Sequence, residues 1–163
     1  MDRTLESGYA SRVGGPVSKK SPKRKRRPGV DACGRTPLHY AAGEGDSHKV
    51  QQLLREGADS NVQDDNGWSA LHFAAQANSE SVAQALVSAG AQVDVRDSYG
   101  NTPLFTAVFN SKGDGAVIKL LRGAGADPYA SNNHGVSPLS LARTIANYDV
   151  AQFYVDLPRI EPT

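Results

Sequence analysis

The chain has little sulfur and few large aromatic residues: its 163 residues include one cysteine, one methionine and one tryptophan. The single cysteine, Cys33, cannot form a disulfide within the chain, which fits a reducing compartment. No apolar run approaches the length of a membrane helix, and residues 1–7 lack the apolar core of a secretory signal. We therefore expect an intracellular, cytoplasmic protein that is neither membrane-inserted nor exported.

The sequence also lacks the patterns of common catalytic sites. It contains no glycine-rich phosphate loop and no nucleophile elbow. His39 and His72 have no third histidine or cysteine at metal-ligand spacing. Asp59, Asp94 and Asp127 recur in corresponding segments, which marks them as loop residues and not as a tuned acid–base pair. We expect no enzyme activity, no cofactor and no bound metal.

What the sequence does contain is a repeat. Residues 34–42 read G-R-T-P-L-H-Y-A-A, and similar segments begin at Gly67, Gly100 and Gly135: G-W-S-A-L-H-F-A-A, G-N-T-P-L-F-T-A and G-V-S-P-L-S-L-A. The first two steps are 33 residues long, and the third is 35 because two residues enter within positions 110–115. A period of this length indicates stacked supersecondary units and not a globular catalytic domain.

Each unit predicts a pair of helices. Threonine or serine can cap the first helix, and proline fits its first position because no donor is needed there. Leu38, Ala41 and Ala42 have helical spacing and form an apolar face. The second helix should end at a glycine in the left-handed conformation, at Gly57, Gly90 and Gly125 in the first three units. The residues that follow lead into a hairpin-like finger around the next unit's first glycine.

The T-P-L-H-x-A-A signature at 36–42 and the G-A-D-x-N segment at 57–61 resemble the ankyrin repeat family. The resemblance covers about residues 31 to 156. It implies an all-α repeat solenoid of four stacked ankyrin repeats, each a helix–turn–helix with a finger loop. The expected units are about 31–63, 64–96, 97–131 and 132–156, within a repeat domain at 30–156 that lies between a disordered basic tail at 1–29 and a C-terminal tail at 157–163.

Departures from the family pattern concern the signature histidine and the last unit. In the family this histidine braces backbone groups between units, so His39 and His72 are expected to be structural. Phe105 and Ser140 replace it in the third and fourth units, so this bracing should weaken toward the C-terminus. The fourth unit has no G-A-D segment, as expected of a terminal unit that closes the stack.

Charge is divided unevenly along the chain. Residues 1–30 carry nine lysines or arginines and two acidic residues, whereas the remaining residues carry nine basic and fifteen acidic residues. The first segment also has prolines, glycines and few apolar residues, so it cannot bury enough surface to fold alone. Its basic residues are Lys19, Lys20, Lys23, Arg24, Lys25, Arg26 and Arg27.

Three interpretations of this basic tail stay open: a solvated tail, a nuclear import or nucleic-acid contact, and a contact with the acidic repeats. No aromatic residue interrupts the basic run and no groove-reading motif follows it. Charge alone would give salt-sensitive, unspecific nucleic-acid binding through the tail.

In the ankyrin family, finger tips and the facing residues of the first helices contact partners. The positions that vary between units here define a candidate patch, with Trp68 as its most informative member because aromatic anchors dominate interface energies. Trp68 could instead fold back onto Tyr99 or the neighbouring finger, and Phe109 could plug the enlarged loop. The predicted partner-binding residues are Cys33, Arg35, Glu44, Asn66, Trp68, Gln76, Tyr99, Asn101, Phe109, Asn110, His134 and Val136.

These features predict a non-catalytic protein–protein interaction module, monomeric when free. The repeats are similar to those of short bacterial ankyrin proteins, some of which are immunity or antitoxin partners of secreted effectors. That resemblance implies a protein that binds and neutralises a partner such as a toxin. The alternative is a eukaryotic nuclear adaptor or scaffold whose basic tail serves import.

Overall fold

The computed structural model describes residues 27–158. The predictions for residues 1–26 and 159–163 lie outside this part of the chain. Within it the elements are α1 (Pro37–Glu44), α2 (Ser47–Arg55), α3 (Ala70–Gln76), α4 (Glu80–Ser88), α5 (Pro103–Asn110), α6 (Ala116–Gly123), α7 (Pro138–Thr144) and the 3₁₀ helix η1 (Val150–Tyr154). Between residues 27 and 158, β-pairing is limited to one isolated bridge, Gln63 with Ser69. The predicted all-α repeat solenoid is confirmed.

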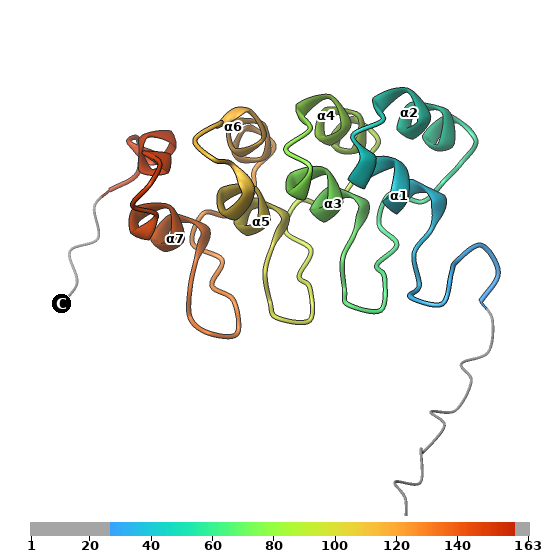
Figure 1. Ribbon diagram of the computed structural model, residues 1–163, viewed down its shortest axis with the longest axis horizontal. Coiled ribbons are helices and arrows are strands. Elements are labelled where there is room, and N and C mark those ends of the chain that lie inside the picture. Colours follow the sequence, from blue (N-terminus) through green and yellow to red (C-terminus); the bar gives the residue numbers. More distant parts are fainter. Residues whose placement is uncertain (1–26, 159–163) are drawn as a thin grey trace, which may run out of the picture.

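The helices form two layers (Figure 1). One layer holds the first helices of the repeats, with α1 against α3, α3 against α5 and α5 against α7. The other layer holds α2, α4 and α6, which also pack in sequence order. Finger loops project from the first layer on the side away from the second (Figure 1). The fold is therefore a linear stack of similar units, as expected when each repeat contacts mainly its neighbours.

The first helix of each repeat begins where the sequence predicts. Thr36, Ser69, Thr102 and Ser137 are the N-cap residues in extended conformation, and proline follows directly in three of the four repeats. The predicted glycines after α2, α4 and α6 are left-handed, with φ of 92°, 84° and 91°. These local signals set where the helices of each pair begin and end.

The core runs along the interface between the two layers. Leu71 and Leu104 are fully buried, as are the small residues Ala74 and Ala75, which let neighbouring helices approach closely. One difference from the regular repeat occurs at the C-terminal end. There the second element is the five-residue η1, which packs on α7 and buries Val150 and Tyr154.

Arg122 fastens this last element to the third repeat. Its guanidinium donates to the backbone carbonyl of Phe153, pairs with Asp156 at 2.6 Å and lies 4.9 Å from the centre of the Tyr154 ring. Together with the burial of Val150, these contacts close the C-terminal end of the stack.

Candidate protein-binding surface

One polar residue holds each finger in shape: Asp31, Asp64, Asp97 and Asn132. In each case Oδ1 accepts hydrogen bonds from the backbone N–H groups two and four residues further along, at 2.8–3.0 Å. The Oδ1 atoms of these side chains therefore stabilise the backbone of the finger loops.

Backbone hydrogen bonds join the fingers to one another. The N–H groups of Asp65, Ser98 and Asn133 each donate to a carbonyl oxygen at the tip of the preceding finger, at 2.9 Å. Gly67 permits this close approach: its φ is 79°, and a Cβ there would lie 2.9 Å from Cα of Asp97. The fingers consequently form one continuous surface.

Trp68 lies between the second and third repeats. Its ring stacks on His72 with centroids 5.6 Å apart and meets Phe73 edge-on at 5.0 Å. Its indole N–H donates to Oδ2 of Asp97 at 3.2 Å. The half-buried ring thus folds back over α3 and the next finger, the arrangement that the sequence left open beside partner contact.

Arg35 and Asn101, one repeat before and after Trp68, also reach the next finger. Arg35 Nε lies 3.4 Å from Oδ2 of Asp64, and its guanidinium lies 5.1 Å from the centre of the Phe73 ring. The side-chain oxygen of Asn101 accepts from Nδ2 of Asn132 at 2.9 Å. Arg35, Trp68, Asn101 and Val136 occupy equivalent positions in the four repeats. The first three of these residues contact the next finger and so link neighbouring repeats. Val136, the fourth member, is half-buried.

The two signature histidines bridge repeats as predicted. His72 Nδ1 accepts from the backbone N–H of Ser69 at 3.2 Å, so its Nε2 carries the proton and donates to the carbonyl of Asn101 at 3.1 Å. His39 Nδ1 accepts in the same way from Thr36, and its Nε2 lies 3.0 Å from the carbonyl of Val62 and 3.1 Å from that of Trp68.

Protonation of these histidines would work against this bonding pattern, because Nδ1 would become a donor facing another donor. Burial is the largest cause that lowers the pKa of both His39 and His72, and backbone hydrogen bonds to Nε2 oppose it. Burial therefore favours the neutral form of both side chains, and their hydrogen bonds to backbone carbonyls give them a structural role. The bracing is absent at Ser140, whose hydroxyl bonds to Ser137 within its own repeat.

Five predicted residues come together around a groove of about 300 Å³ between the second and third repeats. Trp68 and Asn101 line it from the fingers, while Gln76, Phe109 and Asn110 line it from the ends of α3 and α5. The groove thus lies in the angle between the finger loops and the first helices, the region that the resemblance assigned to partner contact.

Phe109 is the most exposed large apolar side chain beside this groove, at 70%. That exposure does not fit the alternative in which the ring plugs the enlarged loop. In the loop itself, Gly113 lies against Tyr148, and Asp114 accepts a hydrogen bond from Asn78 at 3.0 Å. A ring left in water on an otherwise well-packed repeat is a candidate contact for a partner.

The remaining predicted residues lie outside the groove. Cys33, Asn66, Tyr99 and His134 occupy equivalent places at successive finger tips and are exposed, Tyr99 at 62%. Glu44, together with Arg35, lines a separate hollow of about 660 Å³ at the N-terminal end of the stack. The predicted patch therefore consists of the exposed finger-tip residues and the neighbouring groove. Glu44 lies apart from both, at the N-terminal end of the stack.

The sequence reading missed three groove residues: Asp97, Phe105 and Thr106. Sequence signals could have found two of them, Asp97 and Phe105. Asp97 follows Asp64 by one period of 33 residues, and Phe105 replaces the bracing histidine of the signature. Because Phe105 puts an aromatic ring where the first two repeats have a buried histidine, the third repeat lines the groove with a different side chain.

Of the seven basic residues predicted in the tail, Arg27 alone lies in the described part of the chain. It pairs with Asp65 of the second finger at 2.5 Å. Over residues 27–158, no group of three or more His, Cys, Asp or Glu residues could hold a metal ion. The helices in this same part of the chain are too short and too polar to cross a membrane.

Comparison with known families gives a match that covers most of the chain. A family model described as "Ankyrin repeats (3 copies)" matches residues 19–97 and 38–132. No curated protein matches. The matched span includes the helix pairs, the bracing histidines and the fingers of the first three repeats. The chain therefore belongs to the ankyrin repeat family, whose repeats are protein–protein interaction modules.

Proposed function

We propose that the chain binds a partner protein in the groove between the second and third repeats and thereby neutralises or inhibits that partner. The observation that carries this proposal is the 70% exposed ring of Phe109 beside a groove lined by Trp68 and Phe105. Burying a phenylalanine side chain is worth about 1.5–3 kcal/mol, so a partner that covers Phe109 gains affinity at a single contact.

The chemistry of the groove favours an apolar anchor from the partner. Of the eight residues that line it, Asp97 alone carries a charge. The oxygens of Asp97 already accept hydrogen bonds from the backbone of Tyr99 and Asn101 and from the indole of Trp68. A cationic group would gain little from so engaged a carboxylate, whereas an aliphatic or aromatic side chain fits between the rings.

Amide groups surround this apolar centre. Gln76, Asn101 and Asn110 line the groove and can donate to or accept from an extended backbone of the partner. Such an arrangement, with aromatic residues at the centre and polar groups around them, is typical of protein interfaces. In this proposal the partner lies across the finger row and also meets the exposed tip residue Tyr99.

Neutralisation is the simplest effect of such binding, because a rigid stack that covers a partner's surface blocks it without any chemistry. The resemblance of the repeats to short bacterial ankyrin proteins that serve as immunity partners supports a toxin or effector as that partner. The nuclear adaptor alternative predicts instead that the bound partner keeps its activity.

Affinity purification from the native host tests the proposal with three baits: the wild-type chain, Phe109→Ala and Val155→Ala. Val155 is the matched apolar control, since it is 83% exposed at the other end of the stack. The proposal requires a protein that binds the wild-type chain and the Val155 variant, is lost with Phe109→Ala, and loses its own activity when the chain is added. A partner that stays fully active would support the adaptor, and equal capture by all three baits would exclude the groove.

A further inference from the structure

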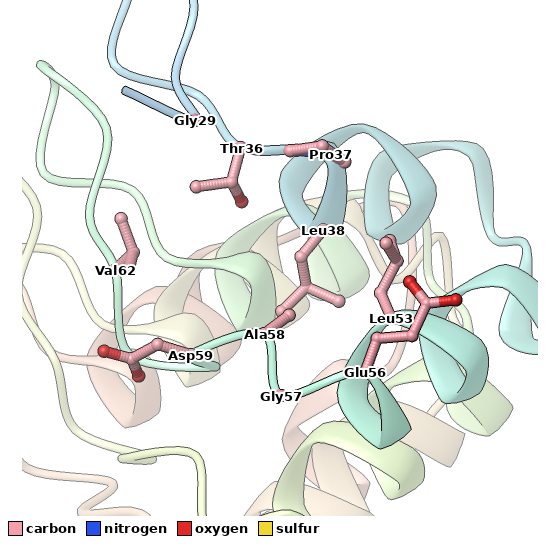
Figure 2. A pocket seen from close by; sticks show the side chains of 10 residues that line it. All are labelled: Gly29, Thr36, Pro37, Leu38, Leu53, Glu56, Gly57, Ala58, Asp59 and Val62. Atoms are coloured by element: carbon pink, nitrogen blue, oxygen red, sulfur yellow. The ribbon is translucent and has the colours of Figure 1, made fainter. Parts of the chain in front are cut away.

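The two ends of the stack differ. At the C-terminal end, η1 packs on α7 in place of a second helix and buries Val150 and Tyr154. At the N-terminal end, the first repeat has a cavity of about 340 Å³, shown in Figure 2. Leu38 lies at its centre, with Leu53 and Glu56 on one side and Val62 and Asp59 on the other (Figure 2).

Comparison of equivalent positions shows that this cavity lies on a face of the first repeat that no other described repeat covers. Leu53 corresponds to Leu86 and Leu121, which are fully buried in the second and third repeats. Leu53 is only partly buried. An apolar wall that is covered elsewhere in the stack is therefore open here, and terminal repeats need such a face to be closed.

The first repeat also carries a charge that its neighbours lack. Glu56 stands where the second and third repeats have Ala89 and Ala124. With Asp59 it gives the apolar cavity two carboxylates, both on exposed residues. An occupant of this cavity should combine apolar side chains with positive charge.

The chain's own N-terminal segment has this composition and enters at this place. Gly29 lines both the cavity and the neighbouring hollow of about 660 Å³. Six lysines and arginines lie at positions 19–26, preceded by Val13, Pro16 and Val17. Arg27, where the described part of the chain begins, already pairs with Asp65.

Two further observations agree. The family model begins to match at residue 19, so the residues before the first finger align with part of the repeat pattern. In the later repeats, the backbone N–H groups of Asp65, Ser98 and Asn133 join each finger to the preceding one. The equivalent group of the first finger is the N–H of Ala32, and no described finger precedes this first finger. At the N-terminal end, the N–H of Ala32 therefore has no described finger to which it could donate.

We infer that residues 13–26 dock on the N-terminal end of the stack, with an apolar side chain in the cavity and basic side chains on Glu56 and Asp59. The attachment at Gly29 makes this an intramolecular event, for which short tethers give effective concentrations on the order of millimolar. A segment that cannot fold alone can still be ordered on a surface that the repeats provide. This docking is independent of the groove proposed to bind a partner.

Amide hydrogen exchange, followed by NMR on the labelled full chain, tests the docking. The test variant is Glu56→Gln with Asp59→Asn, which removes two charges and keeps the acceptors that bond to Gln52 and to the backbone of Asn61. The matched control is Glu80→Gln with Asp127→Asn, which removes two exposed carboxylates elsewhere, Asp127 being the equivalent of Asp59 in the third repeat.

We expect the amides of residues 13–26 to exchange about tenfold or more slowly than in a free peptide, a slowing that local ordering produces. The test variant should lose this protection and the control should keep it, while the core helices stay protected in both. Exchange at the free-peptide rate in the wild-type chain would overturn the inference, as would equal protection in both variants. Protection that disappears on dilution would assign the segment to a second copy and would likewise overturn it.

Discussion

The indole N–H of Trp68 donates to Oδ2 of Asp97 at 3.2 Å, and this bond connects the second finger to the third. The same ring also lines the groove that we propose as the binding site. Trp68 thus has a structural role and, in our proposal, a binding role, which mutations can separate.

Replacement of Trp68 should affect stability in two steps. Trp68→Phe keeps a ring over His72 and Phe73 and removes the N–H donor, so we expect a loss of about 1 kcal/mol in the free energy of unfolding. Trp68→Ala also removes the ring contacts and should cost about 1–3 kcal/mol. Denaturant unfolding measures both. An unchanged stability of Trp68→Ala would show that the ring does not pack between repeats in solution.

Burial predicts different costs for a fully buried leucine and a partly buried one. Leu71→Ala opens a cavity between neighbouring repeats and should destabilise the chain by roughly 2–5 kcal/mol. Leu53→Ala, at the open end, should cost less because its side chain is only partly buried. The comparison uses the midpoint and slope of urea unfolding. A larger loss at Leu53 than at Leu71 would contradict the assignment of the open end.

The histidines predict how stability depends on pH. Burial holds the pKa of His39 and His72 below the unfolded value of about 6.5, so the unfolded chain takes up protons first as the pH falls. The stability contributed by the neutral rings is complete above that value and is lost as the pH drops toward the folded-state pKa. We expect the melting temperature to fall between about pH 7.5 and pH 5.

The variant His72→Gln checks this origin. It should lower stability near neutral pH, since the bond to the Asn101 carbonyl is weakened, and it should flatten the pH dependence. His48→Gln is the control, because His48 is exposed on α2. A pH dependence that stays the same in His72→Gln but disappears in His48→Gln would refute the assignment.

Phe109→Ala should reduce affinity for the partner by about 2 kcal/mol while stability stays close to that of the wild type, since the ring is exposed and contributes little to the core. Tyr99→Ala should act in the same direction from the neighbouring finger tip. Titration calorimetry gives the affinities, and Gln84→Ala on the outer layer is the control. A loss confined to Gln84→Ala would move the binding surface to α2, α4 and α6.

Binding of nucleic acid, if any is observed, should belong to residues 19–27 and weaken steeply as salt rises, because it depends on released counterions. Fluorescence titration with a labelled duplex at several salt concentrations measures the slope. Replacing the basic residues at 19–27 should abolish the binding. Sequence-specific binding by residues 27–158 at physiological salt would require a different function for the repeats.

The sequence by itself determined the repeat and its local structure. The N-caps at Thr36 and Ser69 and the helix-ending glycines follow from short-range rules: a hydroxyl satisfies free N–H groups, and glycine adopts positive φ. These rules act over a few residues, so they can be applied to the sequence directly. The 33-residue period placed equivalent groups in register, and the bracing role of the histidines came from the resemblance to ankyrin repeats.

Only the tertiary structure decided which surface residues are occupied and which are free. Trp68 and Phe109 both read as candidate anchors, yet the first folds back onto His72 and the second stays exposed. Leu53 and Leu86 have the same place in the pattern, yet one lines an open cavity and the other is buried. The reason is physical: burial depends on whether a neighbouring repeat covers the position, and that neighbour is brought close by stacking and not by the local sequence.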